Sequence, residues 1–599
     1  MHTLRRQLRT PAYLSALSLL VAFVVLACMY SVVTPPWEAP DEVGHFQYVA
    51  HLLRTHSLPM QRLGELGEAH QPPLYYAMAA VGAIPADLND PTGTFRLNPH
   101  FMWAGEDGNE VNASFHDSAE TFPFQGQALA LHLARGVSVL MGLMTVGLTI
   151  AIGWECFPNR RSIGLLAGAL VAFNPQFLFI SGSVNNDNLV TMAATGAWWQ
   201  ILRTLKRSEQ WRQWLYAGMW IAVGILAKLA GLVIGVVAGL VLLACAAQRR
   251  SLKLLVHGAL AMTLVAVLIT GWWFAHNQVR YGDPFGWTVY QQVFEVNLRH
   301  SPLQWADLRE FFSVQFRSFW GVFGWMNVSA PSWFYGAARV LCLLSLSGLG
   351  LSAIQGRFSK LSGFQKAALA LLGLVVLAQE MYMIAVITRC DASCYQGRYL
   401  FPIIGPLMVI AGLGLVSLMP RRLTPLLTAG LMLALVGTAI FMPLKVIKPA
   451  YRIVPLPKWN LWFVANKTEF TFGDMFELKG YKVQTDTDSS QVILTLYWQA
   501  MQRPDFDYSV FTHIIDASNQ LIAQKDHAPG DNVDYLPTAW WPGDIIADEH
   551  IIETPPQLAS GTYRFRVGVY DWATGEQLPV LWKGEPIGSF VILDQELHR

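Results

Sequence analysis

Long apolar stretches, each near the roughly 20 residues that a bilayer requires, recur along the first three quarters of the chain. The first, at about 13–33, follows a basic segment with Arg5, Arg6 and Arg9 and has no small-residue cleavage site, so we expect a retained signal-anchor and a cytoplasmic N-terminus. The others lie at about 127–154, 162–183, 188–204, 213–229, 231–247, 254–275, 334–354, 366–388, 399–418 and 424–444. The pattern predicts about eleven transmembrane helices.

Clusters of lysine and arginine support this count, because short cytoplasmic loops carry an excess of these residues. The clusters fall in alternate loops, all on the predicted cytoplasmic side: 160–161, 206–207, 249–253, 357–360 and 421–422. One boundary decides the topology, since the stretch 214–247 must fold as two helices that separate near Lys228 to Gly231. A single helix there would place the C-terminal part of the chain in the cytoplasm.

Composition agrees with a polytopic membrane protein. Of the 599 residues, 53% are hydrophobic and 14% are charged, which is too apolar and too poor in charge for a water-soluble protein of this size. The formal net charge is +1, whereas nucleic acid as a partner requires a basic surface that phosphate can recognise. We therefore expect the cell membrane as the location and no nucleic acid as a partner.

Three large segments are predicted to face the exterior. The first, at about 34–125, has far more acids than bases, and the second, at about 277–331, is rich in aromatic residues that suit the depth of lipid headgroups. The third, 466–599, contains β-rich runs separated by turn residues, which predicts an all-β sandwich. The expected domains are thus a transmembrane domain at 1–445, a linker at 446–465 and this exterior β-domain.

Two smaller features of the exterior segments allow alternative interpretations. Cys390 and Cys394 are the only two of six cysteines in a predicted exterior loop, where a disulfide can form, and metal binding by the two thiols is the less favoured alternative. In the β-domain, Trp540 and Trp541 could stack on sugar rings, but two indoles in a small sandwich are more often part of its core.

Acidic residues and an imidazole gather where the first apolar stretch ends. Pro35, Pro36 and Pro40 disfavour helix, so a helix can restart only after Pro40. Asp41 and Glu42 would then lie in its first turn, with His45 one turn further on. An ordinary helix start with capping acids is the alternative interpretation.

Further polar residues fall at the predicted exterior ends of other apolar stretches. They are His70, Gln71, Tyr75, Asn186, Asp187, Lys228 and Arg398. An ionisable group beside or inside a span is costly and is a functional candidate by default. Lys228 and Arg398 are the best cations for an anionic ligand at the membrane surface, although a snorkelling lysine and an interfacial arginine anchor are the alternatives.

Several motifs, in this order, resemble the GT-C glycosyltransferases. They are Pro36-Trp37-Glu38-Ala39-Pro40-Asp41-Glu42 followed by His45, His70-Gln71-Pro72-Pro73-Leu74-Tyr75-Tyr76, Asn174-Pro175 with Asn185-Asn186-Asp187, Lys228, and Gln396-Gly397-Arg398-Tyr399-Leu400-Phe401-Pro402. The resemblance covers about 10–445 and is to the bacterial branch related to protein O-mannosyltransferases and lipid A aminoarabinose transferases, which is family 39-like. The β-domain is an addition to the plainest members.

The resemblance implies a membrane enzyme that takes a sugar from a polyprenyl phosphate carrier. An acid in the first exterior loop would deprotonate the acceptor hydroxyl, which attacks the anomeric carbon with inversion. By position Asp41 matches that acid, with Glu42 as the second choice, and Lys228 and Arg398 are candidates for holding the departing phosphate. His45, His70, Gln71, Tyr75, Asn186 and Asp187 would bind the sugar, the acceptor or a divalent ion.

Several points stay open at this stage. A divalent cation, Mg²⁺ or Mn²⁺, held by Asp41, Glu42 and Asp187 is an alternative to a metal-free site. The acceptor is a lipid, a polysaccharide or a protein. The main rival function is a non-catalytic, membrane-anchored protein for glycan binding or surface assembly. A transporter fits less well, because the polar residues gather at one face and no paired repeats with broken helices are present.

Overall fold

The computed structural model describes residues 11–598 apart from 63–66, 99–100, 102–110, 117–119, 391–393, 421, 452–454, 457, 486–490, 532–534 and 556–561. By contact the chain divides into two compact units. The first is helical and comprises Met1–Phe95, His100–Ser114 and Phe124–Tyr451. The second is rich in strands and comprises Arg452–Arg599 together with Arg96–Pro99 and Phe115–Pro123.

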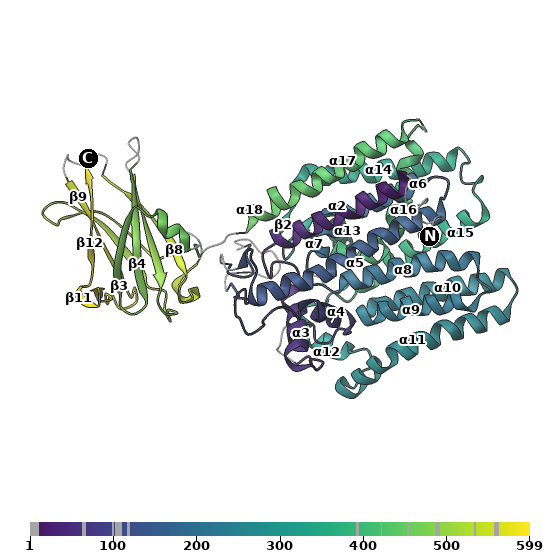
Figure 1. The fold of residues 1–599 in the computed structure, drawn as a ribbon, viewed down its shortest axis with the longest axis horizontal. Helices are drawn as coiled ribbons and strands as arrows, with labels where there is room; N and C mark the ends of the chain where they lie inside the picture. The colour runs from purple at the N-terminus through teal and green to yellow at the C-terminus, as the bar shows by residue number, and fades with distance from the viewer. Residues whose placement is uncertain are drawn as a thin grey trace. The chain divides into compact units, whose positions relative to one another are not determined.

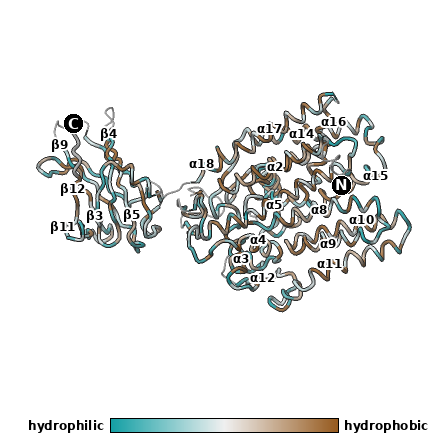
Figure 2. The backbone as a smooth tube through the Cα atoms, viewed as in Figure 1, coloured by the Kyte–Doolittle hydropathy of each residue, from teal (hydrophilic) through white to brown (hydrophobic). Residues whose placement is uncertain are grey.

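The helical unit contains the α-helices of the chain (Figure 1). They are α2 Pro11–Val33, α3 Glu42–Thr55, α4 Leu74–Ala83, α5 Gly126–Cys156, α6 Arg161–Ala172, α7 Pro175–Ser181, α8 Asp187–Lys206, α9 Trp211–Ala227, α10 Leu232–Gln248, α11 Leu252–Tyr281, α12 Trp287–Val293, α13 Trp305–Trp320, α14 Ser332–Ile354, α15 Gly363–Ile387, α16 Ile404–Leu418, α17 Thr424–Met442 and α18 Lys448–Ala450. Apolar residues predominate along the long helices (Figure 2), as lipid contact requires.

The number of membrane spans differs from the expected eleven. Eight helical segments of the described residues are long and apolar enough to cross a membrane, and the pair α6 and α7, bent by 64°, makes a ninth if it is one span. The other two expected spans, 188–204 and 213–229, do form helices, α8 and α9. They fall outside the count because α9 has only 17 residues, whereas α8 carries Gln200, Arg203 and Lys206.

The break near Lys228 is confirmed. Helix α9 ends at Ala227, and Lys228 takes an extended conformation with φ −161° and ψ 142°. A short 3-10 turn, η2 (Leu229–Gly231), then leads into α10. Gly231 packs directly on the backbone of Gly224, where no side chain would fit. This close approach allows two antiparallel helices to be joined by so few residues.

The strand-rich unit has two antiparallel sheets. The larger has the order β11-β10-β3-β4-β5-β8 and the smaller the order β12-β9-β6-β7. The strands are β3 Asn466–Phe472, β4 Phe476–Thr485, β5 Gln491–Ala500, β6 Ser509–Ile515, β7 Leu521–His527, β8 Ile545–Glu553, β9 Thr562–Tyr570, β10 Val580–Trp582, β11 Glu585–Gly588 and β12 Val591–His598. Alternate residues are buried along β8, as sheet-on-sheet packing requires.

The core of this unit includes one residue from far earlier in the chain. Phe115 packs with its ring centroid 4.6 Å from that of Tyr535. Trp540 is fully buried and donates its indole N–H to the Tyr535 carbonyl at 2.7 Å. Trp541, in contrast, keeps 43% of its exposure, with the Arg96 guanidinium 6.0 Å from its ring centroid. The two indoles therefore do not form one exposed pair.

The structure has a disulfide between Cys390 and Cys394. It lies between α15 and the 3-10 segment η5 (Gly397–Ile403), which leads into α16. Arg398 is the second residue of η5 and is buried. The bridge is therefore close in sequence to one of the candidate cations.

Candidate functional site

Asp41 is the residue just before α3, and its backbone adopts a left-handed conformation, with φ 63° and ψ 2°. Its side chain makes no capping hydrogen bond to the helix. This backbone conformation is uncommon for a residue other than glycine, although aspartate tolerates it better than most. The carboxylate instead contacts Arg398, whose Nη2 lies 2.5 Å from Oδ2 of Asp41.

Four charged side chains from four separate segments form one ion-pair network, which we call the Asp41 cluster: Asp41, Asp187, Lys228 and Arg398. Besides its contact with Asp41, Arg398 places Nε 3.7 Å from Oδ2 of Asp187. Lys228 donates to Oδ1 of Asp187 at 2.7 Å. Two acids and two bases balance formally, which lowers the cost of holding charges away from water.

The exposure and the unused donors of the cluster distinguish its members. Arg398 and Asp187 are almost fully buried, whereas the Asp41 side chain keeps 38% of its exposure. Among the described residues, Nη1 and Nε of Arg398 meet no hydrogen-bond acceptor. A buried cationic donor without an acceptor is costly. The cluster is therefore suited to receive an anionic group.

The electrostatics of Asp41 follow from these contacts. Burial by itself would raise the pKa of this carboxyl, but the Arg398 guanidinium, with His45 and Lys228, outweighs burial and lowers the pKa below its usual range. Asp41 is therefore ionised at neutral pH. It can accept a proton, but only weakly for as long as Arg398 stays paired with it.

The predicted histidines lie close to the cluster and are neutral. His45 makes a 2.9 Å hydrogen bond between Nδ1 and the Tyr76 hydroxyl, and burial lowers its pKa to about 3. His70 packs against the rings of Tyr290 and Phe294, and burial, reinforced by Lys228, lowers its pKa to about 3 as well. Both imidazoles are thus hydrogen-bonding groups rather than charges.

The predicted amide residues connect the loop of α4 to the helix break. Gln71 contacts His70, with Nε2 to Nε2 at 3.2 Å. Asn186 donates to the Ala227 carbonyl at 3.2 Å and to Oε1 of Gln71 at 3.4 Å. These bonds join Gln71 and the residue before α8 to Ala227, the last residue of α9. Tyr75 is fully buried, where its hydroxyl contacts Ser138 Oγ at 2.8 Å and accepts the Asn185 backbone N–H at 2.8 Å.

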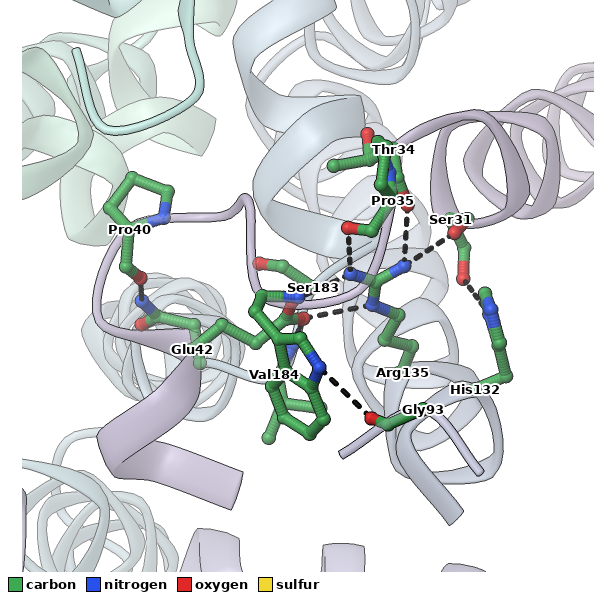
Figure 3. A network of polar contacts seen from close by, with 12 residues as sticks. Ser31, Thr34, Pro35, Pro40, Glu42, Gly93, His132, Arg135, Ser183 and Val184 are labelled. Atoms are coloured by element: carbon green, nitrogen blue, oxygen red, sulfur yellow. Dashed lines mark hydrogen bonds and ion pairs between the residues drawn. The ribbon is translucent and has the colours of Figure 1, made fainter. Parts of the chain in front are cut away.

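The structure does not bring Glu42 into the cluster. Figure 3 shows Glu42 in a separate network around Arg135. Its carboxylate is fully buried and pairs with Arg135 of α5 through bonds of 2.6 and 2.8 Å. It also accepts the backbone N–H groups of Trp37 and Val184. All five donors of Arg135 are used, because its guanidinium also binds the carbonyls of Ser31, Thr34 and Pro35. Glu42 and Arg135 therefore hold the segment between α2 and α3 against α5.

The three carboxylates considered for a divalent ion are not arranged as a metal site. The carboxylate of Asp41 pairs with Arg398, and that of Asp187 pairs with Lys228. The carboxylate of Glu42 pairs with Arg135 and accepts two backbone amides. A divalent ion prefers carboxylate oxygens that converge on one point. Among the described residues, the one group of three or more His, Cys, Asp or Glu that could hold a metal lies in the strand-rich unit.

Glu68 is a site residue that the sequence analysis missed. It packs against Gly44 and lines a cavity of about 490 Å³ together with Gln47, Tyr48, Gln61 and Arg280. Burial and the charge of Asp41 raise the pKa of Glu68 to about 8, against the opposing effect of Lys228. The sequence places it two residues before His70, yet nothing in that spacing indicates that it is partly buried beside the cavity.

This pKa predicts a pH dependence of stability. The pKa of Glu68 in the folded chain, about 8, exceeds the roughly 4.3 of an unfolded glutamate, so the folded state binds more protons between these values. The contribution of Glu68 to stability should therefore be full below about pH 4 and fall as the pH rises to about 8. Thermal unfolding in detergent across this range should show a shallower decline for Glu68→Gln. An identical decline in both chains would contradict the assignment.

The comparisons with known proteins give three kinds of result. The family described as "Predicted membrane protein (DUF2142)" matches residues 127–408. Among curated proteins no sequence matches. Solved structures similar to this chain include GT-C proteins, the class that the sequence motifs resemble.

ArnT from Cupriavidus metallidurans bound to undecaprenyl phosphate is 14% identical, with 72% of this chain and 73% of that one covered and a TM-score of 0.40. The Archaeoglobus fulgidus oligosaccharyltransferase, in complex with Zn and sulfate, is 15% identical, with 72% and 52% covered and a TM-score of 0.35. The S. cerevisiae protein O-mannosyltransferase Pmt1-Pmt2 complex bound to the sugar donor is 19% identical, with 52% and 38% covered and a TM-score of 0.31.

Proposed function

We propose that this chain is an integral membrane glycosyltransferase that moves a sugar from a polyprenyl phosphate carrier to an acceptor hydroxyl, with Asp41 as the general base. The observation that carries the proposal is the Asp41 cluster. It joins residues 41, 187, 228 and 398 at the predicted exterior ends of their helices and leaves donors of Arg398 without acceptors. The donor class comes from the motif resemblance, and the geometry supports it.

The cluster suggests an order of events. A lipid phosphate that binds Arg398 would provide the acceptor that Nη1 and Nε lack and would bring a negative charge beside the guanidinium. The cation would then stabilise the Asp41 carboxylate less, and the pKa of Asp41 would rise toward that of an effective base. Donor binding would therefore activate the base. Without donor, the ion pair with Arg398 would keep Asp41 a weak base.

The transfer step follows from these positions. Asp41 takes the proton of the acceptor hydroxyl, and the oxygen attacks the anomeric carbon as that proton leaves. The bond between the anomeric carbon and the phosphate oxygen breaks, and the phosphate keeps the electron pair. Lys228 and Arg398 stabilise the charge on the departing phosphate. Attack opposite to the leaving group gives inversion at the anomeric carbon.

The experiment that tests this function is transfer of label from a panel of polyprenyl-phosphate sugars to the endogenous acceptor in membranes that contain or lack the chain. Label should reach a lipid, polysaccharide or protein fraction only where the chain is present. Absence of transfer with every donor would favour the alternative of a non-catalytic surface protein anchored by its spans.

Lys228 gives a prediction on donor binding. Lys228→Gln should weaken inhibition by free polyprenyl phosphate by about 10-fold or more, because a hydrogen bond to a charged group contributes about 1.5–3 kcal/mol. Lys228→Arg keeps the charge and should lose less. Lys206→Gln is the matched control, since Lys206 pairs with Glu155 away from the cluster. Equal inhibition of all four chains, wild type included, would remove Lys228 from the donor site.

A further inference from the structure

Two histidines and an aspartate meet where the two sheets of the strand-rich unit come together at their edges. His527 is the last residue of β7, the edge strand of the smaller sheet, and Asp548 and His550 lie on β8, the edge strand of the larger one. Nε2 of His527 is 2.9 Å from Oδ1 of Asp548, and Nε2 of His550 is 2.8 Å from Oδ2. The candidate ligand atoms all lie within 4.8 Å of one another.

We propose that His527, Asp548 and His550 bind one divalent transition-metal ion, for which Zn²⁺ is the best fit, and that the ion ties the two sheets together. Two imidazoles and a carboxylate are a donor set that Zn²⁺ accepts readily. This site is separate from the Asp41 cluster and does not depend on the proposed function.

The contacts of His550 allow the tautomer that a metal ligand requires. The Thr512 hydroxyl on β6 lies 2.8 Å from the Lys525 carbonyl and 3.1 Å from Nδ1 of His550. When the hydroxyl donates to the carbonyl, Nδ1 of His550 carries a hydrogen and donates to Thr512 Oγ1. Nε2 of His550 then presents a lone pair beside the Asp548 carboxylate, where a cation between them would use both.

In the tautomer with the hydrogen on Nδ1, a metal ion suits the site better than a second proton. A second proton, on Nε2, would make His550 a fully buried imidazolium whose ring centroid is 4.0 Å from that of His527. One metal ion neutralises the carboxylate and uses the lone pairs of both rings at once. Metal-bound histidines commonly anchor their other nitrogen by such a hydrogen bond, as His550 does through Thr512.

The surroundings of Asp548 and His527 complete the site. Asp548 is oriented by the Trp498 indole N–H at 3.3 Å and the Gly530 backbone N–H at 3.2 Å. The carboxylate presents Oδ1 to Nε2 of His527 at 2.9 Å and Oδ2 to Nε2 of His550 at 2.8 Å, so both imidazoles converge on one acid. The His527 side chain keeps 12% of its exposure, which gives solvent access for the ion and for a completing water.

Metal binding should add to the stability of the strand-rich unit, because an ion that binds only the folded state shifts unfolding to higher temperature. The test uses the full-length chain, purified in detergent without a histidine tag and stripped with a chelator. Zn²⁺ should then bind at one equivalent per chain and raise the temperature of unfolding. Co²⁺ should give the visible absorption bands of a nitrogen- and oxygen-ligated ion.

The variants make the assignment specific. His527→Gln and His550→Gln should each abolish stoichiometric Zn²⁺ binding and the Co²⁺ spectrum, with His527→Gln as the variant less disruptive to folding because its side chain reaches solvent. His513→Gln, on β6 and outside the trio, is the matched control and should bind as wild type does. Failure of the wild type to bind Zn²⁺ or Co²⁺, or equal loss in all three variants, would overturn the proposal.

Discussion

Replacing Asp41 by asparagine should lower the rate of sugar transfer by about 10²–10⁴-fold or more, because general-base catalysis contributes this range. The amide keeps the size of the side chain but cannot accept the proton. It also loses the charge that pairs with Arg398, so donor binding should persist or tighten while turnover is lost. The measurement is the initial rate of transfer at saturating donor, with the amount of folded chain matched.

The matched control is Asp87→Asn, in the same predicted exterior loop. Asp87 accepts the Asn89 backbone N–H at 2.9 Å and takes no part in the cluster. This variant should keep the wild-type rate. Transfer that survives in Asp41→Asn would move the base to another acid, and Glu68 beside the cluster would be the next to test.

Replacing Glu42 by glutamine should destabilise the chain by about 3–5 kcal/mol, because it removes one partner of a fully buried ion pair and leaves the Arg135 charge without compensation. The loss of a charged acceptor also weakens the bonds from Trp37 and Val184. The effect should appear as a lower temperature of unfolding in detergent and a lower yield of folded protein.

The control for Glu42 is Glu155→Gln, which breaks the pair with Lys206. The side chain of Glu155 is 23% exposed and that of Lys206 is 44% exposed. An exposed pair contributes about 1 kcal/mol or less, so this variant should unfold almost as wild type does. A Glu42→Gln chain that is stable yet inactive would show that Glu42 serves the chemistry rather than the fold, and would contradict its place in the network of Figure 3.

Much of the fold could be predicted from the pattern of apolar residues and basic loops. The two helices on either side of Lys228 follow from that topology, and the structure has them. The span count was less accurate, since length and polarity exclude α8 and α9 although both are helices. Apolar runs locate helices, but how far each one crosses a bilayer depends on packing that the pattern does not contain.

The cluster could be predicted in part because alternating topology places Asp41, Asp187, Lys228 and Arg398 at the same end of their helices. The family resemblance ranks Asp41 before Glu42, but the spacing alone does not separate them, because the two acids are adjacent. The left-handed backbone at Asp41 separates them, and the partner of Glu42 lies 93 residues away inside a long helix. Neither feature has a local sequence signal.

The strand-rich unit shows the same limit. Its strands follow from β-rich runs and turn residues, and the structure has them between 466 and 598. The contribution of Phe115 could not be predicted, because a single aromatic residue in a loop has no periodicity to indicate burial. Asp548 and His550 are two residues apart on β8 and therefore share one face, which the sequence pattern indicates. His527 lies on β7 of the other sheet, and its place beside them depends on how the two sheets pack.

The most direct test of the central claim is to follow the donor lipid itself. Purified chain in lipid vesicles would receive a polyprenyl-phosphate sugar and an acceptor extract, and mass spectrometry would measure the release of free polyprenyl phosphate. We expect release that requires both the acceptor and Asp41, with the product sugar inverted at its anomeric carbon. A wild-type chain that binds the donor but never releases the lipid phosphate, or a product with retained configuration, would contradict the account.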